Sequence, residues 1–280
     1  MAVTYNKQTK TLFFTSDSKG VGNGVLVNLL TLLKDELNII LDAEKAIFDL
    51  EYESFETYFA KLGSLNNASS GGKPIYFNKV KKIVFGPKIK VVGVKNAPKF
   101  IVAQIFPNVK EISVLGEAVL GTQVFCNLDL DYISMPKVTY FKEACFKGTI
   151  FKNTKFYLPA TLEFISNDVF KDTNITTLVF NSKPSFVSVF IFGYFRSKVN
   201  IQKLVLPDYA SFSEVVLSAV IPKQNSSERI PIKIEITNSS DIAQCKEKYA
   251  TKYDSGDITS YYDVINIKAD IYRPTKIFED

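Results

Sequence analysis

The chain has 280 residues, of which 46% are hydrophobic and 22% charged, a composition typical of a folded protein with a sizeable core. It contains no histidine, which excludes Ser-His and Cys-His catalysis and histidine-ligated metals within the chain. Its 34 basic and 29 acidic residues are mixed along the sequence, so the net charge of +5 forms no basic stripe and we expect no nucleic-acid partner.

The cysteines and the apolar runs exclude further classes. Cys126, Cys145 and Cys245 are far apart and form no C-x-x-C pair, which argues against a zinc site and a disulfide framework. The first residues lack the pattern of a signal peptide, and no apolar run reaches the roughly 20 residues of a membrane helix. We therefore expect no cofactor, no metal, no membrane insertion, and synthesis in the cytoplasm.

A glycine-rich turn lies near the N-terminus, between a predicted strand and a predicted helix. Gly20, Gly22 and Gly24 could let the backbone approach a pyrophosphate, with Asp42 holding a ribose, as in a dinucleotide site. However, Val25 stands where the third glycine of G-x-G-x-x-G is needed, and no second βαβ half follows. A flexible or attachment turn is the favoured interpretation.

Residues 23–62 are predicted to be mainly helical. Apolar residues recur at helical spacing from Val25 and again from Phe48. The stretch GSLNNASSGG at residues 63–72 then has the composition of a flexible linker. The sequence therefore predicts an N-terminal strand and helical attachment region, with its linker, over residues 1–72.

A repeat begins near residue 80. Six segments share the pattern apolar-x-x-apolar-x-apolar, mostly followed by Pro or Gly, and each unit is about 20 to 30 residues long. Stacked units of this size bury a continuous core and leave a parallel sheet along one face. The predicted inward residues are Val80, Ile83, Phe85, Ile112, Val114, Ile133, Met135, Phe156, Leu158, Leu178, Phe180, Leu204 and Leu206.

A second element, the return segment, recurs between the predicted strands as VTYFKEACF and LEFISNDVF. Its apolar positions match, so that Cys145 aligns with Val169 and Phe146 with Phe170. This combination of strand, Pro turn and return segment resembles the BspA-type family of leucine-rich repeats, over about residues 80–207. The resemblance implies a fold and interaction class without catalytic residues. The units VLGEAVLGTQVF and SKPSFVSVFIFGYF depart from the pattern, so we expect these two coils to be distorted.

The predicted fold is an α/β-type repeat solenoid: a leucine-rich-repeat stack with a short parallel sheet, a helical N-terminal region and a mixed C-terminal cap. The solenoid is expected over residues 73–227 and the cap over residues 228–280. In the family that the chain resembles, a strand, a Tyr-containing helix and a short apolar strand often close the solenoid. The segments ERIPIKIEIT, SSDIAQCKEKYATKY and DVINIKADIY are similar to these three pieces.

The candidate binding residues lie on the outward side of the predicted sheet. Strand alternation places Tyr132 and Tyr157 next to Lys155 in the middle coils, with Val179 and Lys203 further along. Aromatic residues beside a cation are of the types that carry interface energy. We expect these five residues to bind a partner; for each of them, a merely solvated sheet face is the alternative.

The sequence favours a non-enzymatic protein-interaction or structural protein. One version is a bacteriophage virion component, a tail or head fibre, since proteins resembling this family usually act at cell surfaces and this chain shows no export signal. Its partner would be a virion neighbour, or a host surface protein or glycan, and a homo-oligomer is compatible with this role. An intracellular scaffold is the alternative, and a nucleotide-binding enzyme that uses the glycine-rich turn is the third hypothesis.

Overall fold

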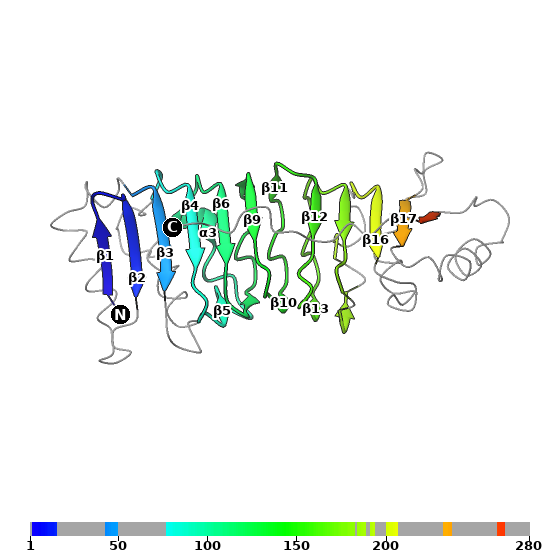
Figure 1. Ribbon diagram of the computed structural model, residues 1–280, viewed down its shortest axis with the longest axis horizontal. Helices are drawn as coiled ribbons and strands as arrows, with labels where there is room; N and C mark the ends of the chain where they lie inside the picture. The colour runs from blue at the N-terminus through cyan, green and yellow to red at the C-terminus, as the bar shows by residue number, and fades with distance from the viewer. Residues whose placement is uncertain are drawn as a thin grey trace.

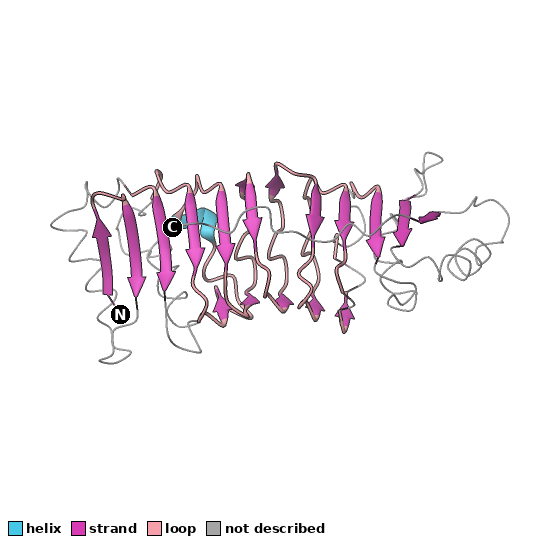
Figure 2. Ribbon diagram, viewed as in Figure 1, coloured by secondary structure: helices cyan, strands magenta, loops and turns pink. Residues whose placement is uncertain are grey.

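The computed structural model is built almost entirely from short strands. It describes residues 2–15, 43–49, 77–182, 184–188, 191–193, 200–206, 232–236 and 262–266. In this described part the one helix is a single turn, α3 (Val102–Ile105). The strands stand side by side along the long axis of the molecule, so that successive coils of the chain stack on one another (Figures 1 and 2).

The longer strands form two sheets that follow one another along this axis (Figure 1). In the first sheet β1 pairs antiparallel with β2 and all other neighbours are parallel; in the second sheet all neighbours are parallel. The first sheet consists, in order, of β1 (Ala2–Asn6), β2 (Thr11–Thr15), β3 (Lys45–Asp49), β4 (Lys82–Phe85), β6 (Glu111–Val114) and β9 (Tyr132–Ser134). The second consists of β12 (Lys155–Tyr157), β14 (Thr177–Val179), β16 (Lys203–Leu206), β17 (Ile232–Ile236) and β18 (Tyr262–Asn266). We call them the long-strand sheets.

Two-residue strands from the same coils form a third parallel sheet, which we call the short-strand sheet. It lies along the lower edge of the molecule in Figure 1. Its members, in order, are β15 (Phe186–Val187), β13 (Phe164–Ile165), β10 (Tyr140–Phe141), β7 (Val119–Leu120) and β5 (Val91–Val92). A separate parallel pair is formed by β8 (Asp129–Leu130) and β11 (Ile150–Phe151).

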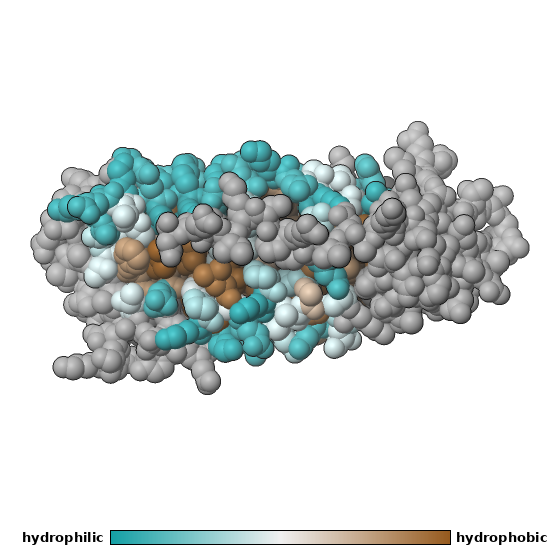
Figure 3. Space-filling model, viewed as in Figure 1, coloured by the Kyte–Doolittle hydropathy of each residue, from teal (hydrophilic) through white to brown (hydrophobic). Residues whose placement is uncertain are grey.

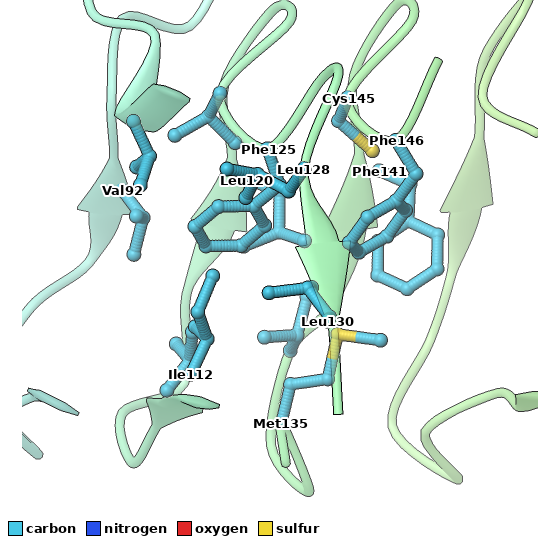
Figure 4. Close-up of a cluster of buried hydrophobic side chains, with 14 of the residues drawn as sticks. Val92, Ile112, Leu120, Phe125, Leu128, Leu130, Met135, Phe141, Cys145 and Phe146 are labelled. Atoms are coloured by element: carbon cyan, nitrogen blue, oxygen red, sulfur yellow. The ribbon is translucent and has the colours of Figure 1, made fainter. Parts of the chain in front are cut away.

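The core lies between the long-strand sheets and the short-strand sheet, where side chains from both converge (Figure 4). The predicted inward residues are confirmed: twelve of them are buried and Ile133 is half-buried. One column of aromatic rings runs through the return segments, with centroid distances of 5.8 Å from Phe125 to Phe146, 6.0 Å from Phe146 to Phe170 and 6.0 Å from Phe170 to Phe192.

The predicted α/β class with a helical N-terminal region is wrong. Phe48, expected at helical spacing, lies in strand β3, which pairs with β2 and β4. In this strand Ala46 and Phe48 alternate with half-buried residues, and the Phe48 ring stacks on Phe14 at 4.4 Å and on Phe85 at 5.1 Å. Period-two burial between neighbouring strands therefore overrides the helical spacing. The other positions of the predicted helices fall mainly on residues 16–42 and 50–76, outside the described residues.

The expected distortion of two coils is also wrong where the structure describes them. Val124 and Phe125 occupy the same place in their coil as Cys145 and Phe146 in the next, because the Phe125 N–H donates to the Cys145 carbonyl at 2.9 Å. The Phe170 N–H likewise donates to the Ile191 carbonyl at 2.8 Å. Left-handed residues also recur at matching places, with φ of 56° at Gln123, 55° at Ala144 and 58° at Asp168.

Strand pairing crosses both predicted domain limits. In the first sheet β3 pairs with β4, and in the second sheet β16 pairs with β17. Strands β17 and β18 lie where the two closing strands of the cap were expected. The long-strand sheets therefore extend at both ends beyond the predicted solenoid.

Candidate interaction surfaces

The predicted binding residues lie on the long-strand sheets, and four of the five are half-buried. Tyr132 is in β9, Lys155 and Tyr157 are in β12, and Lys203 is in β16. The Lys155 Nζ lies 5.0 Å from the centroid of the Tyr157 ring, within the range of a cation–π interaction. Tyr132 is not joined to this pair by strand pairing, because β9 ends the first sheet and β12 begins the second.

The outward positions of the neighbouring long strands that correspond to Tyr157 are largely buried. Val179, the fifth predicted residue, is only 1% exposed, and Val205, its partner in β16, is 2% exposed. Ser113 and Ser134, which pair with each other in β6 and β9, are also buried. Strand alternation thus did not predict the accessibility of these side chains, and Val179 offers almost no surface to a partner.

Charged side chains of both signs lie in or beside the turns that precede the long strands. Lys10 pairs with Glu44 at 2.6 Å, and Lys110 forms a close ion pair with Asp129. Figure 3 shows a hydrophilic band along this edge of the described region. Because such solvent-exposed pairs contribute about 0 to 1 kcal/mol each, this edge is a solvated rim.

The short-strand sheet carries a different surface. Its inward residues are all buried, and its outward residues form one apolar column, which consists of Val91, Val119, Tyr140, Phe164 and Phe186. The Tyr140 ring stacks on Phe164 at a centroid distance of 5.7 Å, and Phe164 stacks on Phe186 at 4.6 Å. We call these three rings the aromatic ladder. Phe186 is 49% exposed, the largest fraction for a large hydrophobic side chain among the described residues.

Opposite charges flank the aromatic ladder. On one side, the Lys142 Nζ lies 5.9 Å from the ring centroid of Tyr140 and 5.3 Å from that of Phe164. On the other side lies Glu163, which raises the pKa of Tyr140 chiefly because its carboxylate favours the protonated, hydrogen-bonding phenol over the ionised one. The ladder is thus an apolar strip with a cation along one edge and an anion along the other.

The sequence itself indicates the ladder, through aromatic residues beside the inward positions of the return segments. In three successive coils an aromatic residue directly precedes the inward residue, as Tyr140 precedes Phe141 and Phe164 precedes Ile165. These aromatic residues lie at outward positions, next to the inward positions that define the repeat. Phe186, the third aromatic, lies in a coil that was expected to be distorted.

The described residues offer little for catalysis or metal binding. Cys126 and Cys145 are free and buried, and burial raises the pKa of both thiols, so they stay protonated at neutral pH. In the part of the chain that the structure describes, no group of three His, Cys, Asp or Glu residues could hold a metal ion. The glycine-rich turn at Gly20, Gly22 and Gly24, and Cys245, lie outside the described residues.

No protein-family model, no curated protein and no solved structure matches this chain. The resemblance to BspA-type leucine-rich repeats therefore stays an expectation that rests on the repeat pattern. Across the described ranges, no helix has the length and apolar character needed to span a membrane.

Proposed function

We propose that this chain is a non-enzymatic interaction protein that binds a protein partner through its short-strand sheet. The observation that carries the proposal is the aligned apolar column that ends in Phe186, half of whose surface is exposed. Contiguous apolar patches that reach the surface of a folded protein often mark interaction sites. Aromatic side chains also carry a large share of binding energy in protein interfaces.

The ladder rests on a rigid base, which supports its use as a binding surface. Each of its residues has an inward neighbour that is buried in the core: Phe141, Ile165 and Val187. Parallel pairing fixes the strands against one another, and the stacked rings restrict one another's rotation. Binding then costs little side-chain entropy, since the contact residues are already ordered.

A comparison of single variants tests the proposal. The full-length chain is immobilised, and the proteins retained from cells of the source are compared between wild type and Phe186→Ser. Ile150→Ser is the matched control, because Ile150 is 45% exposed but lies in β11, outside the short-strand sheet. We expect a partner that wild type and the control retain and Phe186→Ser loses. Retention at the wild-type level by Phe186→Ser would contradict the proposal.

The surface expected from the sequence is tested in the same assay. A double variant, Tyr132→Ala with Tyr157→Ala, removes both half-buried aromatics from β9 and β12. If it retains the partner while Phe186→Ser does not, binding belongs to the short-strand sheet alone. Nucleotide binding is tested separately by thermal shift, where saturating NAD or ATP that raises the melting temperature would favour the enzyme hypothesis.

A further inference from the structure

We infer that the partner seated on the short-strand sheet is a second copy of this chain, so that two such sheets face each other in a symmetric dimer. This inference rests on the proposed function, since it names the partner of the same surface. The arrangement brings together the apolar columns of both copies, each consisting of Val91, Val119, Tyr140, Phe164 and Phe186.

The spacing of the ladder favours a second copy. Outward residues of neighbouring parallel strands repeat at the strand spacing of about 4.8 Å. The stacked rings, whose centroids lie 5.7 and 4.6 Å apart, are nearly parallel, with interplanar angles of 22° and 16°. Neighbouring rings therefore cover one another's faces along the aromatic ladder. A surface whose side chains repeat at the same spacing can place one side chain against each of the five strands. The short-strand sheet of a second copy has that spacing.

The flanking charges give the strip a self-complementary edge. Lys142 follows the inward residue of β10, and Glu163 precedes the outward residue of β13, so they lie on opposite sides of the column in adjacent coils. A twofold axis along the column reverses the strand direction of the partner. It therefore places Lys142 of each copy near Glu163 of the other, within reach of two long side chains. The same contact occurs twice in the dimer, as it must in an isologous interface.

Among the described residues, neither Lys142 nor Glu163 forms an ion pair within its own chain. The Lys142 Nζ lies 5.9 Å and 5.3 Å from the ring centroids of Tyr140 and Phe164, and Glu163 lies close enough to the Tyr140 phenol to raise its pKa. Each charge therefore lies against the apolar column of its own copy. In the dimer each of them gains a charge of opposite sign, and electrostatic complementarity of this kind selects the partner and the orientation.

Charge reversal tests the arrangement. Lys142→Glu and Glu163→Lys are made singly and together in the full-length chain, and association is measured by sedimentation velocity over a range of concentrations, with circular dichroism to verify folding. Each single variant creates two like-charge contacts, so we expect the dimer dissociation constant to rise about tenfold or more. The double variant exchanges the charges and restores attraction, so we expect a dissociation constant within about threefold of wild type. Association of the wild type should weaken as salt is added.

Further variants separate this inference from the proposed function. Phe186→Ser is expected to abolish association, whereas Ile150→Ser leaves it unchanged. A wild-type chain that is monomeric at every concentration overturns the dimer, as does a double variant as weak as the single ones. If the monomeric wild type still retains another protein through Phe186 in the pull-down comparison, the proposed function stands without the dimer; if it retains none, both fail.

Discussion

The side chain of Asn174 pairs with both backbone polar groups of Phe151. Its Oδ1 accepts a hydrogen bond from the Phe151 N–H at 2.8 Å, and its Nδ2 donates to the Phe151 carbonyl at 2.8 Å. Phe151 belongs to β11, whose one pairing strand is β8. The amide of Asn174 therefore takes the place of a further strand on β11, and it satisfies backbone groups that would otherwise be costly to bury.

Replacement of Asn174 should be more destabilising than replacement of an asparagine that makes one such bond. Asn174→Leu removes both hydrogen bonds to Phe151, and we expect the free energy of unfolding to fall by about 1 to 3 kcal/mol. Asn181→Leu is the control, because its Nδ2 makes a single bond, to the Leu158 carbonyl at 2.7 Å. Urea denaturation measures the free energy of unfolding of both variants. A smaller loss for Asn174→Leu than for Asn181→Leu would mean that the second hydrogen bond of Asn174 adds no stability.

Thr149 is expected to stabilise the coil through its hydroxyl more than through its methyl group. It is completely buried, its Oγ1 donates to the Phe125 carbonyl, and the Leu128 N–H donates to Oγ1 at 3.5 Å. Thr149→Val keeps the shape but leaves the Phe125 carbonyl unpaired, which should cost about 1 to 3 kcal/mol. Thr149→Ser keeps the hydroxyl and should cost about 1 kcal/mol, the value of one buried methyl group. If chemical denaturation shows a larger loss of stability for Thr149→Ser than for Thr149→Val, the packing of the methyl group contributes more than the hydroxyl.

Phe170 should be among the most costly single truncations in the described core. Its ring stacks on Phe146 at 6.0 Å and lies 5.2 Å from Phe156, with 1% of its surface exposed. Phe170→Ala should therefore lower the free energy of unfolding by about 3 to 5 kcal/mol. Ile150→Ala serves as the control and should cost less than about 1 kcal/mol, because Ile150 is 45% exposed and lies outside the short-strand sheet. Equal melting temperatures for the two variants would show that the return segment is not packed as described.

Stability should fall at alkaline pH, partly because of Cys145. Burial raises the pKa of this thiol well above its ordinary range. In the unfolded chain a thiol ionises above about pH 8.5, so this contribution is fully present below that pH and is lost as the pH rises toward the folded pKa. Cys145→Val places at this position the residue found at Val124 and Val169 in the neighbouring coils. The drop in melting temperature from pH 7 to pH 10, in reductant, should be smaller in this variant; an unchanged drop would contradict the assignment.

Removal of residues 1–76 should destabilise the rest of the chain. The deletion takes away β3, which pairs with β4, and Phe48, which stacks on Phe85 at 5.1 Å. It would leave an unpaired edge at β4 and an uncovered apolar end, both of which promote aggregation. We expect the 77–280 fragment to be poorly soluble or to melt well below the full chain, by light scattering and circular dichroism. A soluble fragment that melts within a few degrees of the full chain would make the N-terminal strands a dispensable addition.

The inward positions of the strands were predictable because buried residues alternate along a strand in the sequence itself. In β4, for example, Ile83 and Phe85 alternate with half-buried residues. A strand was predicted before the glycine-rich turn, where β2 lies, but its pairing within the stack and the strand β3 were missed, for two reasons. Their coils are longer than the later ones, as the pairing of Thr11 with Lys45 and of Lys45 with Lys82 shows. In addition, Phe48 also fits a helical spacing.

Part of the candidate site was also predictable. The contact of Lys155 with Tyr157 follows from their places two residues apart on one strand. The burial of Val179 could not be predicted from the sequence of its own strand, because accessibility depends on contacts with residues distant in sequence. The absence of pairing between β9 and β12 is equally non-local.

That interruption between β9 and β12 has a mechanical consequence. Between β4 and β9 and between β12 and β14, neighbouring coils are joined by strand pairing both in a long-strand sheet and in the short-strand sheet. At the interruption the long-strand sheets stop, and the strand pairings that cross from one coil to the next are β10 with β13 and β8 with β11, each only two residues long. A force along the axis would therefore be carried at this seam by these short pairings and by hydrogen bonds between return segments, such as that from the Phe146 N–H to the Val169 carbonyl at 3.2 Å, without a long-strand ladder.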